Sequence, residues 1–327
     1  MSSASEATEK GAAVTGSPGA GAIGLAAGIG LVSAVVGLAP WLVTGERLPL
    51  QNLWAAPTLP DDMPFALLPL NQYFVAAIAA MLIVGGGVAG TVMRVRAARG
   101  RALPVWPAVV GLLVVQLGSL AQSAAVLRPG LRADAGVSAY AQAYLVAMVL
   151  GTVLCSALAV VVLLMIARAG VAGAAVAWGV ASIALGSWLS ALLKSEPAFG
   201  TAVSGSVLSH FYQWLPVVGA AAAAAWSGFV TARRAVATLV ILVMLWVLPA
   251  LVTAMSYVLT PMYTTYPEDM LLAGLDVLRM ALGPDGGAPR RLVVAVTVAL
   301  AVAAWRLIAR RRDRDPGIVP TRVDDPV

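Results

Sequence analysis

The stretch LVAMVLGTVLCSALAVVVLLMIA, residues 145–167, runs for 23 residues without a single charge. A helix needs roughly 20 apolar residues to cross the hydrocarbon core of a bilayer. The stretch lacks the alternation of apolar and polar residues that marks a barrel strand. Because backbone groups in lipid find no water partner, only a helix satisfies them here. The sequence therefore predicts a transmembrane helix over this stretch.

Eight runs of this kind occur along the chain of 327 residues. They lie at about 21–43, 73–93, 105–127, 140–167, 171–193, 211–231, 235–260 and 292–308. The last of them is the shortest. The pattern predicts an all-α, polytopic integral membrane protein with about eight transmembrane helices.

The composition points to the same class. Hydrophobic residues make up 60% of the chain and charged residues 11%, and the mean hydropathy is +0.90. In soluble proteins about a quarter of the residues are charged. The net charge of +6 is spread over short arginine groups between uncharged runs, so no nucleic-acid partner is predicted. One cysteine and one histidine exclude a disulfide framework, a cysteine-based zinc site and a bis-histidine haem within this chain, and no cofactor is predicted.

The segment MRVRAARGR, residues 93–101, determines the predicted orientation. It places Arg94, Arg96, Arg99 and Arg101 between the second and third apolar runs. With eight spans and a cytoplasmic N-terminus, 14 of the 21 Lys and Arg residues fall on the cytoplasmic side together with the short loops, and 7 fall outside. The positive-inside rule requires this distribution. The outer seven are Arg47, Arg128, Arg132, Lys194, Arg279, Arg290 and Arg291.

We interpret this cluster, together with Arg310, Arg311 and Arg312 after the last run, as topogenic. Contact with anionic lipid head groups, at about 1 kcal/mol for each juxtamembrane arginine, is a second interpretation. Both termini are predicted to be cytoplasmic, and membrane lipids are predicted partners. The residue usage, rich in Ala, Val, Arg and Gly, suggests a bacterial protein, so we expect the bacterial inner membrane.

The predicted division of the chain follows from these spans. Residues 1–18, rich in Ser, Ala, Gly and Thr, are predicted to form a disordered cytoplasmic tail. This start is not basic and the apolar run after it is too long for a cleavable signal peptide, so the run is expected to stay as an anchor. Residues 19–312 form the transmembrane domain, with outer loops at 44–72, 128–139, 194–210 and 261–291, and residues 313–327 form a second cytoplasmic tail.

Two outer loops carry structural signals of their own. The first has prolines at positions 49, 57, 60, 64 and 69, which disfavour a regular helix. Trp54 and Phe65 make the same loop too apolar to be disordered, so we predict a lid on the outer face. In the last outer loop, leucines at 271, 275, 278 and 282 recur at helical spacing, which predicts a short amphipathic interfacial helix.

Polar residues within the apolar runs are the candidate site. Gln116, Ser119 and Ser123 share one face of the third run. Ser187, Ser190 and Lys194 share one face of the fifth. His210 and Tyr212 stand at the start of the sixth run, and Ser256 and Tyr257 follow Pro249 in the seventh. Such groups either form hydrogen bonds between helices or line a polar cavity that opens outward, and both interpretations stay open.

The sequence shows no reaction signature. No Asp, Glu, Lys or His lies in the middle third of any predicted span, and no phosphate-binding loop, zinc-protease motif or nucleophile elbow occurs. We therefore predict no catalytic residue and no metal site, and we expect the protein not to be an enzyme.

Small residues give helices close-packing faces. Gly24 and Gly28, Gly86 and Gly90, and the stretch Ala220–Ala225 form such faces, which could contact another membrane protein as readily as this chain. Elaborate outer loops and an uncharged core favour a non-enzymatic membrane subunit or envelope-assembly factor that works on the extracytoplasmic side. The alternative is a permease-like carrier or channel for a small neutral or lipidic solute.

Overall fold

The computed structural model describes residues 19–43, 45–131, 138–194, 207–259, 267–286 and 288–312. The two predicted tails, 1–18 and 313–327, lie outside these residues, as do 132–137, 195–206 and 260–266 of the predicted outer loops.

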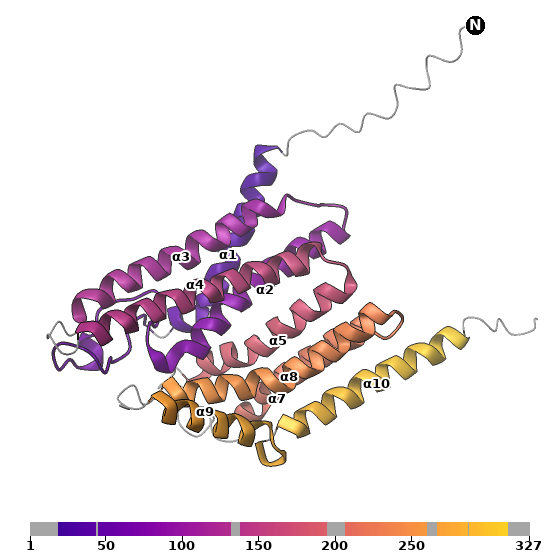
Figure 1. Ribbon diagram of the computed structural model, residues 1–327. Helices are drawn as coiled ribbons and strands as arrows, with labels where there is room; N and C mark the ends of the chain where they lie inside the picture. Colours follow the sequence, from indigo (N-terminus) through magenta and orange to yellow (C-terminus); the bar gives the residue numbers. More distant parts are fainter. Residues whose placement is uncertain are drawn as a thin grey trace, which may run out of the picture.

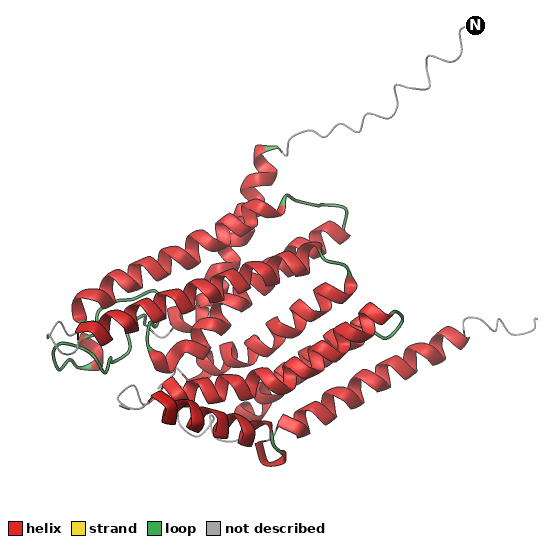
Figure 2. Cartoon of the chain, viewed as in Figure 1, coloured by secondary structure: helices red, strands yellow, loops and turns green. Residues whose placement is uncertain are grey.

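The described chain is helical, with no β-strand (Figures 1 and 2). With the labels of Figure 1, the helices are α1 (Ala20–Val43), α2 (Val75–Ala98), α3 (Val105–Gly130), α4 (Ser138–Arg168), α5 (Val171–Lys194), α7 (Val207–Ser227), α8 (Ala232–Leu259), α9 (Pro267–Leu282) and α10 (Ala288–Arg312). Each predicted apolar run corresponds to one of these helices, although the run at 211–231 extends past the end of α7 at Ser227.

Among the described residues, six helices, α1 to α5 and α8, are long and apolar enough to cross a membrane. The apolar stretch described in α7, Trp214–Ser227, is shorter than these six. The fold is therefore that of an all-helical, multi-pass membrane protein. The count of eight spans and the cytoplasmic placement of both termini stay predictions.

The two ends of the bundle differ in their connections (Figure 1). Residues 99–104, 169–170 and 228–231 form short links at one end, which we call the short-loop end. The opposite end carries the long segment 45–71, which we call the lid segment. Within the lid segment the only helical turn is Pro60–Asp62, as the spacing of prolines predicts.

The lid segment is fixed to the helices by buried hydrogen bonds. Trp41 Nε1 donates to the carbonyl oxygen of Ala66 at 2.7 Å, and Tyr144 Oη donates to Gln51 Oε1 at 2.8 Å. Since buried polar groups are costly unless paired, these contacts hold the lid segment in one position.

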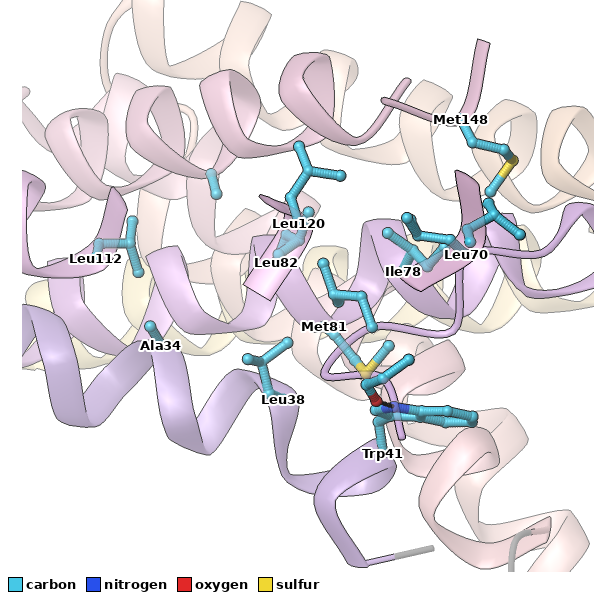
Figure 3. Close-up of a cluster of buried hydrophobic side chains, with 14 of the residues drawn as sticks. Ala34, Leu38, Trp41, Leu70, Ile78, Met81, Leu82, Leu112, Leu120 and Met148 are labelled. Atoms are coloured by element: carbon cyan, nitrogen blue, oxygen red, sulfur yellow. Dashed lines mark hydrogen bonds between the residues drawn. The ribbon is translucent and has the colours of Figure 1, made fainter. Parts of the chain in front are cut away.

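The interior is divided into two hydrophobic cores. The first lies among α1 to α4 and the lid segment, where Leu38, Met81 and Leu112 are fully packed (Figure 3). The second lies among α5, α7, α8 and α10, around Ile241 and Ala295. α5 joins the two halves, because its residues also pack against α2 and α4.

Glycines allow the closest helix contacts in the first half. A Cβ atom on Gly86 would lie 2.2 Å from the carbonyl oxygen of Ala159, and one on Gly90 would lie 2.9 Å from that of Leu163. The pair on α2 therefore packs α2 directly onto α4. Gly24 and Gly28 on α1 have no atom within 4 Å of the Cβ position, so that this face meets no helix in the described part of the chain.

The predicted amphipathic helix is present as α9, Pro267–Leu282. It packs along α8, where Trp246 Nε1 donates to the carbonyl oxygen of Leu282 at 3.2 Å. This contact brings the start of α10 close to the middle of α8.

Candidate functional site

A cavity of about 900 Å³ lies where the two halves of the bundle meet, and it extends to the lid segment. α2 and α5 supply much of its wall, and α8 lies opposite them. Single residues of α4, α7 and α10 complete the wall, together with the end of α1 and the lid segment.

Short side chains explain why the helices leave this space. α2 presents Ala76, Ala77, Ala79 and Ala80 to the cavity, and α5 presents Ala184, Gly186 and Ala191. Leu245, Leu248 and Val252 face the cavity from α8. Because α2 and α8 hardly touch each other, alanine side chains on α2 are too short to close the gap. The result is a wall that is mainly hydrocarbon.

A few polar groups interrupt the hydrocarbon wall. Ser187 and Ser190 reach it from α5, and Thr253 reaches it from α8, where its hydroxyl donates to the carbonyl oxygen of Pro249 at 2.9 Å. Tyr73, Arg47 and Arg291 also line the cavity. In the described wall the two arginines are the only charged side chains.

The two arginines come from separate elements. Arg47 belongs to the lid segment, where an antiparallel bridge pairs it with Phe65 and its Nη1 donates to the carbonyl oxygen of Met63 at 3.0 Å. Arg291 lies in the first turn of α10. Its neighbour Arg290 stacks 5.8 Å from the ring centre of Trp214, which holds the start of α10 against α7.

The level of Arg291 along the bundle follows from neighbouring contacts. Trp214, on which Arg290 stacks, is two residues before Pro216, and Pro216 packs against Gly186 of α5. Gly186 directly precedes Ser187 in the chain. Along the bundle axis, the first turn of α10 is therefore at the same height as Ser187 of α5, in the half of the bundle that carries the lid segment.

The structure separates the two predicted polar stripes. Gln116, Ser119 and Ser123 on α3 are at most 4% exposed and do not line the cavity. Gln116 Nε2 donates to the carbonyl oxygen of Leu82 at 3.0 Å, and Ser123 Oγ accepts from the backbone N–H of Leu68 at 2.8 Å. The stripe on α3 thus connects helices and lid segment, whereas Ser187 and Ser190 line the cavity.

The remaining predicted cavity residues are not gathered with these serines. Ser256 and Tyr257 are exposed near the end of α8, and 52% of Tyr257 is accessible. The side chains of Lys194, His210 and Tyr212 lie outside the described residues, as do those of Arg310, Arg311 and Arg312.

The four arginines of the cluster at the short-loop end also differ in their surroundings. Arg94 donates through Nη1 to the carbonyl oxygens of Ile166 and Ala169, at 2.8 and 3.0 Å, and so satisfies the C-terminus of α4. Its guanidinium also lies 5.8 Å from the ring centre of Trp178 and 5.3 Å from that of Trp226. It therefore joins α2 and α4 of the first half to α5 and α7 of the second.

Two other members of the cluster are more exposed than Arg94. Arg99 and Arg101 are exposed, and Arg96 is half-buried. Their position at the end of α2 agrees with a topogenic or lipid-contacting role, which stays a prediction.

Sequence reasoning did not single out Arg47, Tyr73 and Arg291 as site residues. One signal was present, because Arg47 and Arg291 are among the seven basic residues on the predicted outer side, where the positive-inside rule makes arginine rare.

The described residues contain no group of three His, Cys, Asp or Glu side chains that could hold a metal ion. The arrangement is that of a binding cavity, apolar along its wall and basic where the lid segment and α10 reach it. Comparison with protein-family models, curated proteins and solved structures finds no match to this chain.

Proposed function

We propose that this membrane protein binds a lipid-like molecule in the cavity between α2, α5 and α8, and acts on that molecule as a non-enzymatic carrier or assembly factor. The observation that carries the proposal is the cavity of about 900 Å³ with an alanine-, leucine- and valine-rich wall. This volume lies within the range of roughly 300–1,000 Å³ that is typical of small-molecule sites.

The chemistry of the wall favours hydrocarbon over a hydrated solute. Burial of apolar surface contributes roughly 25 cal/mol per Å², and most of the surface that a ligand would meet here is apolar. The hydroxyls of Ser187 and Ser190 are too few to replace the hydration shell of a polar solute. An acyl or isoprenoid chain fits these conditions.

A carrier and an assembly factor, one from each of the two functional classes that the sequence leaves open, both need this binding step. A carrier would release the lipid across or along the membrane, and an assembly factor would present it to a partner. The predicted excess of basic residues at the short-loop end supports an extracytoplasmic position for the lid segment.

The test is native mass spectrometry of the full-length protein in a neutral detergent, titrated with dioleoyl phosphatidylcholine. One lipid should bind saturably to the wild type. Ser187→Leu and Ala80→Leu, which place bulk inside the cavity, should abolish that binding. The matched control Ala222→Leu adds the same bulk to an exposed position of α7 outside the cavity wall and should leave it unchanged.

The same purification also separates the proposal from a purely structural role. If no lipid binds saturably, or if Ser187→Leu binds as the wild type does, the lipid-binding proposal is wrong. A stoichiometric protein partner that copurifies without any lipid in the cavity would favour a membrane subunit instead.

A further inference from the structure

We propose that the ligand of this cavity is an anionic amphiphile whose phosphate-bearing head group is bound by Arg47 and Arg291. The inference rests on the proposed function and adds the chemical class of the head group to it. Its main evidence is the charge of the side chains that line the cavity.

The charges of the described cavity wall all have one sign. Arg47 and Arg291 line it, and no Asp or Glu side chain does so among the described residues. The one salt bridge found in the described residues joins Arg279 to Asp276 on α9, so neither cavity arginine is neutralised in this way. Arg291 is half-buried, so its charge carries a desolvation cost that a bound anion would offset, whereas Arg47 is exposed and lines the cavity with most of its donors available.

Arg291 also occupies an unfavourable position in its helix. The N-terminus of a helix carries a partial positive charge, and acidic side chains or bound anions stabilise it. The first turn of α10, which begins at Ala288, contains Arg290 and Arg291 and has no acidic residue. A bound anion would offset both the helix dipole and the arginines. The helix terminus is thus a second, independent contribution to the positive potential at this point.

The geometry suits a head group more than a free anion. Ser187 is level with the first turn of α10, and the hydrocarbon wall continues past it to Val180 and Ile183 on α5 and to Leu158 on α4. Arg47 uses one of its five N–H donors for the carbonyl oxygen of Met63 and keeps the others. A phosphate bound by the arginines would leave its chains to the hydrocarbon wall that the alanines of α2 and α5 form.

The experiment compares dioleoyl phosphatidylglycerol with dioleoyl phosphatidylcholine, which have the same chains, by native mass spectrometry of the full-length protein. Each arginine should contribute about fivefold to the preference for phosphatidylglycerol. Arg47→Gln and Arg291→Gln should each lower the preference by that factor, and the double variant should lose it. Arg291→Lys should keep most of the preference.

Arg128→Gln is the matched control, because Arg128 is an exposed arginine at the lid end of α3 that does not line the cavity. It should leave the preference unchanged. Equal binding of the two lipids by the wild type, a measurement that needs no variant, would overturn the inference while leaving the proposed function intact. A preference that survives in the double variant would do the same.

Inorganic phosphate separates the two possible sources of the anion. It should not displace phosphatidylglycerol at concentrations near those of the lipid, because the chains supply much of the affinity. Displacement of phosphatidylglycerol from the wild type by phosphate at such concentrations would assign the arginines to a soluble anion and overturn the lipid assignment. If neither lipid binds saturably, the proposed function fails together with this inference.

Discussion

Arg94 offers the sharpest test of how the two halves of the bundle are held together. It forms two hydrogen bonds to the C-terminal carbonyl oxygens of α4 and stacks on tryptophans of α5 and α7. Replacement by methionine keeps much of the side-chain length but removes the donors and the charge. The tryptophan pair, with ring centres 4.8 Å apart, would then lose its cationic neighbour.

The magnitude follows from these contacts. Hydrogen bonds to a charged group contribute about 1.5–3 kcal/mol in soluble proteins, but hydrogen bonds between membrane helices average only about 0.6 kcal/mol. A guanidinium over aromatic rings adds about 0.5–2 kcal/mol. Two bonds at the membrane value plus the stacking predict a loss of about 2–3 kcal/mol for Arg94→Met. Arg94→Lys keeps the charge but loses the planar, two-pronged geometry, so it should lose about 1 kcal/mol.

The assay is reversible unfolding in mixed micelles with tryptophan fluorescence as the signal. Arg99→Met is the control, because Arg99 belongs to the same cluster and is exposed; it should change the unfolding free energy by less than about 0.5 kcal/mol. Equal losses in Arg94→Met and Arg99→Met would refute the reasoning, since both would then act only through charge.

Three further predictions concern helix packing, the lid segment and the orientation of the chain. Gly86→Ala should destabilise the protein by about 1–3 kcal/mol in the same assay, since its Cβ would lie 2.2 Å from a backbone oxygen of α4. The control Gly24→Ala, whose Cβ meets no atom within 4 Å, should be neutral or slightly stabilising. A larger loss in Gly24→Ala than in Gly86→Ala would contradict the contact between α2 and α4. Tyr144→Phe should cost about 1–2 kcal/mol and speed hydrogen exchange in the lid segment, because a buried hydrogen bond of 2.8 Å is lost; unchanged exchange would show that the lid does not depend on it. In a cysteine-free background, a cysteine at exposed Ala55 should react with an impermeant thiol reagent in intact cells and one at exposed Ala98 should not, whereas labelling at Ala98 would reverse the predicted orientation.

The sequence alone determined the elements and their order. Each apolar run became a helix because lipid offers the backbone N–H and C=O groups no hydrogen-bond partner outside the chain. The length and composition of a run are therefore sufficient to predict a helix there. The prolines of residues 45–71 excluded a long helix there, and the leucine spacing predicted α9, because both signals act within a few residues of the chain.

Only the tertiary structure decided which polar residues face the cavity. A helical wheel places Gln116 and Ser123 on one face of α3 and Ser187 and Ser190 on one face of α5, but it does not say which neighbour that face meets. In the folded protein the first pair is covered by α2 and the lid segment, and the second borders the cavity. Arg94 and Arg99 are likewise equivalent in a charge count, and they differ because α4 ends beside Arg94. The cavity itself has no local signature, since it is the space left by alanines of α2 and α5 opposite α8, and helices far apart in the chain must be brought together before that space exists.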